Sequence, residues 1–437
     1  METKKLLEND SFCVLPWMHL YKNMDNSVKL CCVDKGSPIG SLSENSVEEI
    51  RNSEEFTKLR KSFLNGEKLD RCTECWSWEK NGYQSYRQSQ NKDYIDQLPE
   101  HIFEDEPLEI TYLDYRPSNL CNLACKICSP RFSSKLIDPW LQVGQIKPEE
   151  VTKLTKFNVN RIDVETVKKD FTHIKNIYFA GGEPLIADDH WNLLEHFSKN
   201  NPKEIKIKYN TNLTKLDFKG KKVEDYWGKF GKIQIGASLD GYGKQFEHLR
   251  TGASWDVVIS NLQRIKTLSD KIQIELKAQY GENIRNKGID IYCDATVGWL
   301  NLKSVFKLHK FLYENKYIIL DDPNYYKLLA KPLNFPYGAS LACTPPELKP
   351  ELIESIEVHK EWVNSVYEFD TTSWISDLNS LISNISSSNY NEDKVREWLA
   401  ISTYLDTKYK LHTPTAFQFK SETWNSKFLE LYNTKSI

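Results

Sequence analysis

The chain has 437 residues, of which 40% are hydrophobic and 27% are charged, as in a globular protein with two or three domains. The net charge of −3 gives no overall signal for a nucleic acid or an anionic membrane as partner. There is no apolar run long enough to span a bilayer, and the start lacks the apolar segment of a signal peptide, so the chain is expected to be cytoplasmic.

The first predicted domain is a cysteine-rich segment of residues 1–90. It carries five of the chain's ten cysteines, and cysteines of an intracellular protein are more often metal ligands than disulfides. The run from Ser46 to Glu49 has the pattern of a capping box, so a helix is predicted to begin there and to end near Gly66. The polar stretch from Gln84 to Lys92 is interpreted as a linker.

The cysteines of this segment are Cys13, Cys31, Cys32, Cys72 and Cys75. One CxxC pair together with Cys13 and Cys31 supplies four thiolates, which suits one iron–sulfur cluster. Cys32 is the alternative to Cys31, and only one of them is expected to bind because neighbouring residues of a strand point to opposite faces. Structural zinc is the other interpretation, although zinc ribbons usually have a pair of CxxC motifs and this segment has one.

Residues 108–330 are predicted to alternate strands and helices, which indicates a parallel sheet. Strands are predicted at 110–115, 174–180, 204–209, 232–237 and 271–277. A helix capped by Ser254 is expected between the last two strands. Residues 331–437 are predicted to form a mainly helical C-terminal extension.

A run of three cysteines follows the first of these strands. Cys121, Cys125 and Cys128 have CxxxCxxC spacing, which suits a cubane iron–sulfur cluster with one iron left without a protein ligand. The position after a strand is where parallel α/β sheets build active sites. A zinc knuckle is the alternative, but it needs a fourth ligand, and no His or Cys follows within the loop.

A glycine-rich turn follows the second strand. It consists of Gly181, Gly182, Glu183 and Pro184. Two glycines after a buried strand let the backbone approach a ligand closely, and the glutamate adds an acceptor, although an ordinary βα turn has the same appearance. The CxxxCxxC run followed by this turn resembles the radical S-adenosylmethionine (SAM) superfamily, in which the open iron binds the amino and carboxylate groups of SAM.

The resemblance implies an α/β fold with a partial, six-stranded (β/α) barrel. It implies a SAM-binding 4Fe–4S cluster on Cys121, Cys125 and Cys128, with SAM as the second cofactor. In this family the glycine-rich turn, here with Glu183, holds the amino group of SAM. The residue before the third cysteine is usually aromatic and lies by the adenine; here it is Ile127, which can also pack on a base.

Further SAM-binding residues are expected after the third and fourth strands. They are Asn210, Thr211, Ser238, Asp240 and Arg250. The stretch from Ser238 to Arg250 resembles the peptide-modifying and sulfatase-maturing branch of the family, in which the serine and the arginine bind the SAM carboxylate. An arginine fork matches a carboxylate with two hydrogen bonds. The alternatives are a polar core for the first pair, a turn for Asp240 and a solvated helix end for Arg250.

The N-terminal segment resembles a SPASM or twitch domain, which binds auxiliary iron–sulfur clusters. Asn26 takes the place of the usual turn glycine and tolerates the same left-handed backbone. The ligands that the resemblance implies are Cys13, Cys31, Cys72 and Cys75, for one auxiliary cluster. In most relatives this domain follows the barrel, whereas here it precedes it.

These features predict an oxidoreductase or maturase-like enzyme that cleaves SAM to a 5′-deoxyadenosyl radical, which then abstracts hydrogen from a peptide or protein side chain. One alternative is a radical SAM enzyme acting on a small molecule, such as a nucleoside or sugar. Another is a non-catalytic scaffold for SAM and iron–sulfur clusters. A reductant such as flavodoxin or ferredoxin is the expected partner, and the sequence gives no sign of a membrane partner and no strong nucleic-acid signal.

Overall fold

The structure is a computed structural model that describes residues 2–80, 82, 84–157, 164–281, 284, 287–318, 329–411 and 419–433. The chain divides into two compact units, which are described separately. The first contains residues 1–118 and 157–208, and the second contains residues 119–156 and 209–437. The three domains predicted from the sequence remain a prediction. In the described ranges there is no helix that has both the length and the hydrophobicity needed to cross a membrane.

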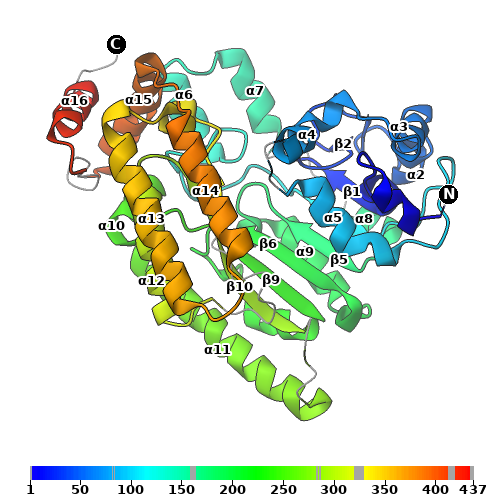
Figure 1. Cartoon of the computed structure of the whole chain (residues 1–437). Helices are drawn as coiled ribbons and strands as arrows, with labels where there is room; N and C mark the ends of the chain where they lie inside the picture. The colour runs from blue at the N-terminus through cyan, green and yellow to red at the C-terminus, as the bar shows by residue number, and fades with distance from the viewer. Residues whose placement is uncertain are drawn as a thin grey trace. The chain divides into compact units, whose positions relative to one another are not determined.

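The first unit is built on a mixed sheet (Figure 1). Its strands, in their order across the sheet, are β5 (Asn176–Phe179), β4 (Tyr112–Tyr115), β1 (His19–Lys22), β2 (Ser27–Lys29) and β3 (Gly40–Ser41). β4 pairs in parallel with both β5 and β1, and His19 of β1 lies opposite Tyr112 of β4. β1, β2 and β3 pair antiparallel. A strand from the cysteine-rich segment therefore extends the parallel sheet by main-chain hydrogen bonds.

The helices of this unit are α1 (Leu15–Met18), α2 (Val47–Arg51), α3 (Glu54–Leu64), α4 (Thr73–Lys80), α5 (Tyr86–Tyr94), α8 (Val164–Asp170) and α9 (Asp188–Phe197). The capping box is confirmed, since the Ser46 hydroxyl accepts from the backbone of Glu49 and the Glu49 carboxylate accepts from that of Ser46. The predicted single helix is two helices, because Ser53 accepts a hydrogen bond from the Phe56 backbone and starts α3 as its N-cap.

The interpretation of Gln84 to Lys92 as a linker is wrong, because this stretch forms most of α5. Ser85 caps the helix, and several of its polar side chains are buried. Asn91 shows the reason, since its amide donates to the carbonyl of Phe12 and accepts from the backbone N–H of Val14, at 2.8 and 2.9 Å. The polar side chains thus satisfy buried backbone on either side of the first cysteine.

β6 (Lys206–Thr211) carries the chain from the first unit to the second. The second unit has the strands β9 (Lys232–Ala237), β10 (Gly288–Val297) and β11 (Leu329–Pro332), with β10 parallel to both others, and a hairpin of β7 (Asp217–Phe218) and β8 (Lys221–Lys222). The prediction for 232–237 is confirmed residue for residue.

The prediction of a strand at 271–277 is wrong, because these residues lie in the helix α11 (Trp255–Tyr280). The alternation of apolar and polar residues there also fits a helix, since Ile272 and Leu276 continue a buried stripe that starts at Val258. The parallel partner that follows β9 in the chain is β10, which begins at Gly288. The helix predicted after Ser254 is confirmed, and Ser254 is its N-cap residue without a side-chain cap hydrogen bond.

The other helices of the second unit are α6 (Ile137–Gln142), α7 (Pro148–Lys156), α10 (Gly243–Leu249), α12 (Leu302–Glu314), α13 (Lys349–Val366), α14 (Thr372–Ser386), α15 (Glu392–Tyr409) and α16 (Glu422–Asn433). The mainly helical C-terminal extension is confirmed, and α13 and α14 run side by side in it (Figure 1). In the described part of the chain, α-helices separate the strands β4, β5, β6, β9, β10 and β11, as in the predicted partial (β/α) barrel, except that the β7–β8 hairpin and two short 3-10 helices lie between β6 and β9.

Candidate active site

The CxxxCxxC loop belongs to the second unit, and side chains hold its backbone. The Asn119 amide donates to the carbonyls of Pro130 and Leu154, each at 3.1 Å. The backbone N–H of Cys128 donates to the carbonyl of Cys125 at 3.1 Å, so the last two cysteines share one turn. The loop is therefore a fixed structure with its own hydrogen bonds.

The three thiols of this loop lie close enough to affect each other's ionisation. Burial, and then the neighbouring Cys121 thiol, raise the pKa of Cys128 to about 12. Burial also raises the pKa of Cys125 well above its ordinary value, whereas the Arg250 guanidinium lowers it. The Asn212 amide contacts the Cys121 sulfur at 3.9 Å. A metal cation reverses the effect of burial, because it binds the thiolate and releases the proton.

Arg250 is positioned beside these thiols by backbone hydrogen bonds. The N–H groups of Ala124 and Lys126 donate to the carbonyls of Thr251 and Leu249, at 2.9 and 2.8 Å. Arg250 stands between the two acceptor residues in the sequence, and Cys125 stands between the two donor residues. The cysteine loop and the arginine segment therefore form one hydrogen-bonded structure.

The guanidinium of Arg250 is paired with one carboxylate, and its Nε has no partner among the described residues. Its Nη2 lies 2.7 Å from Oδ2 of Asp240, and both side chains are almost fully buried. The other oxygen of Asp240 accepts from the backbone N–H of Thr296 at 2.8 Å, which holds the carboxylate in place. The Nε of Arg250 is buried without a hydrogen-bond partner among the described residues. A buried donor of this kind fits a ligand carboxylate.

The predicted residues Asn210 and Thr211 end β6, and Ser238 follows β9 directly. Ser238 is half-buried, and its backbone N–H donates to the carbonyl of Thr211 at 2.9 Å. The Asn210 amide donates to Asp294 of β10 at 2.9 Å. Gly236 of β9 leaves room for the Asn210 side chain, because a Cβ atom at Gly236 would lie 2.8 Å from the Asn210 side-chain oxygen. Asn210 thus has a structural partner, as the polar-core alternative expected.

The glycine-rich turn belongs to the first unit and is described within it. The Gly182 N–H donates to the carbonyl of Ser118 at 2.9 Å. Gly181 has a φ of +112°, and a Cβ atom there would lie 3.0 Å from the same carbonyl, so the turn needs glycine. Glu183 is buried, and its carboxylate accepts from the N–H of Leu185 at 3.1 Å. Pro184 is buried as well, whereas Ile127 in the second unit is half-buried.

The N-terminal cysteines also come together in the first unit. Cys13, Cys31, Cys72 and Cys75 line one small cavity. Its other walls are Leu15, Pro16, Leu30, Phe63, Tyr86 and Arg87. Among the described residues there is no group of three or more His, Cys, Asp or Glu side chains gathered as ligands of a single metal ion. The thiols instead surround a space with mostly apolar walls.

Cys31 and Cys32 take different positions at this cavity, and the strand alternation expected for them does not apply. β2 ends at Lys29, so the two cysteines lie in the turn after it and not in a strand. Cys31 lines the cavity, whereas Cys32 is exposed and is not among the lining residues. Asn26, at the start of β2, has the left-handed backbone expected of it, with a φ of +64°.

Backbone donors face the sulfur atoms of the cavity. Burial raises the pKa of Cys13, Cys31 and Cys75, and the backbone N–H groups of Leu15, Val33 and Arg87, respectively, oppose this rise. Hydrogen bonds to sulfur are among the features that set the potential of an iron–sulfur cluster. The Arg87 side chain is itself neutralised by Glu79 at 2.9 Å.

The sequence interpretation missed the residues that hold the cysteine loop from the C-terminal extension. Lys126 of the loop is buried and forms an ion pair with Asp406 of α15. A lysine inside the cysteine run is visible in the sequence, but its partner lies 280 residues away. The sequence signal for this contact was the row of buried residues on α15. Such a row predicts that the helix packs against something, but it does not identify the cysteine loop as the packing partner.

Two family models match the chain at these sites. The model described as the radical SAM superfamily matches residues 115–285. The chain contains a radical SAM domain. A SPASM model, described as an iron–sulfur cluster-binding domain, matches residues 13–76, so this domain precedes the radical SAM domain in the sequence. The radical SAM domain implies a 4Fe–4S cluster and SAM as cofactors, and the SPASM domain implies an auxiliary iron–sulfur cluster.

Solved structures of SuiB from Streptococcus suis, one of them bound to S-adenosylmethionine, match this chain at 16% identity and a TM-score of 0.33. The matches cover 71% and 72% of this chain and 59% and 62% of the SuiB chains. The chain thus spans about three fifths of the length of the solved proteins that it matches. A search of curated proteins finds no match.

SAM binding is expected to weaken when either predicted polar contact is removed. Arg250→Ala and Glu183→Ala each delete a charge-assisted hydrogen bond, which is worth about 1.5–3 kcal/mol or about 10- to 150-fold in affinity. Glu183→Gln removes the charge of the side chain but keeps an oxygen that accepts from the Leu185 N–H. This variant therefore distinguishes the loss of charge from the loss of the turn's structure. Equilibrium titration of the reconstituted protein with SAM measures the change.

The matched control is Arg264→Ala. Arg264 pairs with Asp217 and Glu224 on the surface of the second unit, so its loss should leave SAM affinity unchanged. Unchanged affinity in both Arg250→Ala and Glu183→Ala would mean that the SAM pocket lies elsewhere.

Proposed function

We propose that this chain is a radical SAM enzyme that removes a hydrogen atom from a peptide or protein side chain. The observation that carries the proposal concerns Arg250, whose Nε is buried without a partner among the described residues. Its backbone neighbours accept hydrogen bonds from the loop of Cys125 and Cys128. When bound, the cluster and SAM supply a 5′-deoxyadenosyl radical. The residues of the chain hold these groups and place the substrate.

In this proposal the cysteine loop binds the cluster and Arg250 binds the carboxylate of SAM. Asp240 keeps the guanidinium in place from one side, and Thr296 keeps Asp240 in place. The carboxylate of Glu183 binds the amino group of SAM. The N–H of Leu185 orients that carboxylate, and its burial strengthens the contact by excluding water.

The cavity in the first unit would hold one auxiliary cluster on Cys13, Cys31, Cys72 and Cys75. Four thiols around one cavity match the usual ligand number of a cubane. The exposed Cys32 is left out of this set. The N–H donors at the sulfur atoms would tune the potential of the cluster.

The choice of a peptide or protein substrate rests on the resemblance of the stretch from Ser238 to Arg250 to the peptide-modifying branch.

The proposed reaction needs an external electron donor. A flavodoxin or a ferredoxin fits this role, because both deliver single electrons at low potential. The proposal is that such a protein reduces the cluster on the CxxxCxxC loop.

Deuterium transfer into 5′-deoxyadenosine tests the substrate class. The reduced protein is incubated with SAM and with deuterated peptides, nucleosides or sugars, and mass spectrometry reports which compound supplies the hydrogen. Transfer from a peptide is the expected result. Transfer from a small molecule alone would replace the substrate and keep the radical chemistry, whereas failure to form any 5′-deoxyadenosine would favour a binding scaffold.

A further inference from the structure

A buried ion pair joins the cysteine loop to the C-terminal extension. Lys126 lies in the loop between Cys125 and Cys128, its side chain is 0% exposed, and its Nζ is paired with Asp406 of α15, which is 4% exposed. The same Nζ donates to Nε2 of His248 at 2.7 Å. Asp406 also accepts a hydrogen bond from the Tyr432 hydroxyl at 2.7 Å. The two charges are thus buried together with polar partners on both sides.

The backbone of Lys126 is held as firmly as its side chain. Its carbonyl accepts from the indole N–H of Trp398 on α15 at 3.0 Å. Its N–H donates to Leu249, next to Arg250. One residue of the cysteine loop therefore connects α15 with the segment that carries the proposed carboxylate-binding arginine.

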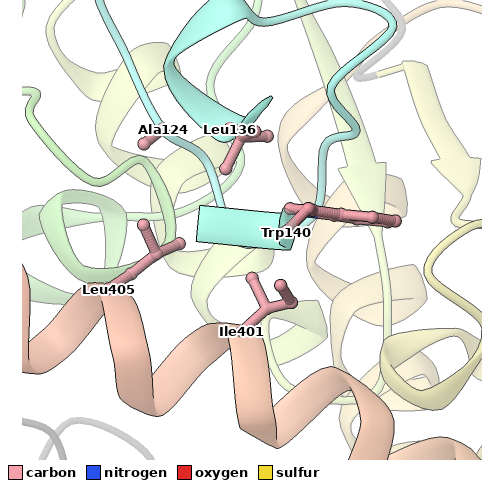
Figure 2. Close-up of a cluster of buried hydrophobic side chains, with 5 residues drawn as sticks. All are labelled: Ala124, Leu136, Trp140, Ile401 and Leu405. Carbon is pink, nitrogen blue, oxygen red and sulfur yellow. The ribbon is translucent and has the colours of Figure 1, made fainter. Parts of the chain in front are cut away.

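Apolar packing reinforces this connection. Ala124 of the loop packs with Leu136, Trp140, Ile401 and Leu405, and Cys128 lies against the same cluster. Figure 2 shows Ile401 and Leu405 on the α15 side facing Trp140, Leu136 and Ala124. α15 is thus a direct support of the loop and not a peripheral addition.

Two features of this arrangement have a consequence for the cluster. A buried charge is tolerated only when it is paired, so removing one member of the pair leaves the other uncompensated. In a low-dielectric interior, an uncompensated charge acts strongly on a neighbouring redox centre. Lys126 directly follows Cys125, so the ion pair is anchored in the loop that carries the proposed cluster ligands.

We propose that Lys126 and Asp406 are positioning residues of the radical SAM site. The pair fixes the cysteine loop against the Arg250 segment, and its two opposite charges balance the electrostatic potential at the cluster. This inference rests on the proposed cluster site at Cys121, Cys125 and Cys128. It assigns the C-terminal extension a role in SAM cleavage.

The test uses Asp406→Asn, Lys126→Met and the double variant, each in the full chain with both clusters reconstituted. Redox titration followed by electron paramagnetic resonance gives the midpoint potential of the SAM-binding cluster. Asp406→Asn leaves a positive charge and should raise the potential, whereas Lys126→Met leaves a negative charge and should lower it. The double variant should return toward the wild-type value. Both single variants should also bind SAM more weakly.

Lys394→Met is the control, because Lys394 pairs with Glu397 on the exposed face of the same helix. It should change neither the potential nor SAM affinity. Shifts of the same sign in the two single variants, no shift in either, or loss of the cluster from all three Lys126 and Asp406 variants would overturn the inference. A wild-type chain that binds no cluster on the CxxxCxxC loop would instead refute the proposed function, so the two failures are distinguishable.

Discussion

Replacing Cys121, Cys125 or Cys128 by alanine is expected to abolish the reductive cleavage of SAM. The loop has three thiols for a cubane cluster, which normally has four cysteine ligands. With only two thiols left, the loop should no longer bind the cluster stably. Anaerobic reconstitution followed by dithionite reduction and chromatography of 5′-deoxyadenosine measures the effect. The expected yield is at background.

Cys343→Ala is the matched control for the loss of a buried thiol. Cys343 is fully buried in the second unit, where its thiol donates to the carbonyl of Asn391. This variant should keep wild-type SAM cleavage. Continued release of 5′-deoxyadenosine by the three loop variants would remove the central assignment of the cluster to this loop.

The second large effect is expected at the N-terminal cavity, where Cys13→Ala or Cys72→Ala should separate two activities. The cluster on the CxxxCxxC loop should remain and cleave SAM, whereas turnover of the true substrate should be lost, because the auxiliary site loses one of its four thiols. Iron analysis should fall from about eight to about four irons per chain, as expected for two cubane clusters of which one is lost.

Cys32→Ala provides a control one residue away from a proposed ligand. Cys32 is exposed and does not line the cavity, so its replacement should keep both the iron content and substrate turnover. The same measurements decide between cluster and zinc. Stoichiometric zinc together with only about four irons in the wild-type chain would remove the auxiliary cluster from the proposal.

Much of the parallel sheet could be predicted from the sequence, because buried strands have short apolar runs with clear ends. β9 is the plainest example, since all six of its residues are buried and all six were predicted. The strand predicted at 271–277 failed because the apolar positions in these seven residues fit about two turns of an amphipathic helix as well. Only the longer stripe from Val258 to Leu276 distinguishes the two.

The candidate site divides in the same way. Motifs with local spacing, such as the CxxxCxxC run and the glycine-rich turn, identified the segments that the radical SAM model matches. Contacts between segments far apart in the sequence could not be predicted, because the sequence around one partner does not indicate which distant residue it contacts. The pairing of β1 with β4 and the ion pair of Lys126 with Asp406 are both of this kind.

The support of the cysteine loop by α15 has a consequence for the order of synthesis. The ribosome makes Lys126 280 residues before Asp406, an interval of about 15 to 60 s at about 5–20 residues per second. Throughout that time the nascent loop lacks its ion-pair partner and the apolar side chains of Ile401 and Leu405. The native conformation of the loop is therefore completed only after Asp406 has been made, so a fully supported cluster site forms well after the cysteines themselves are synthesised.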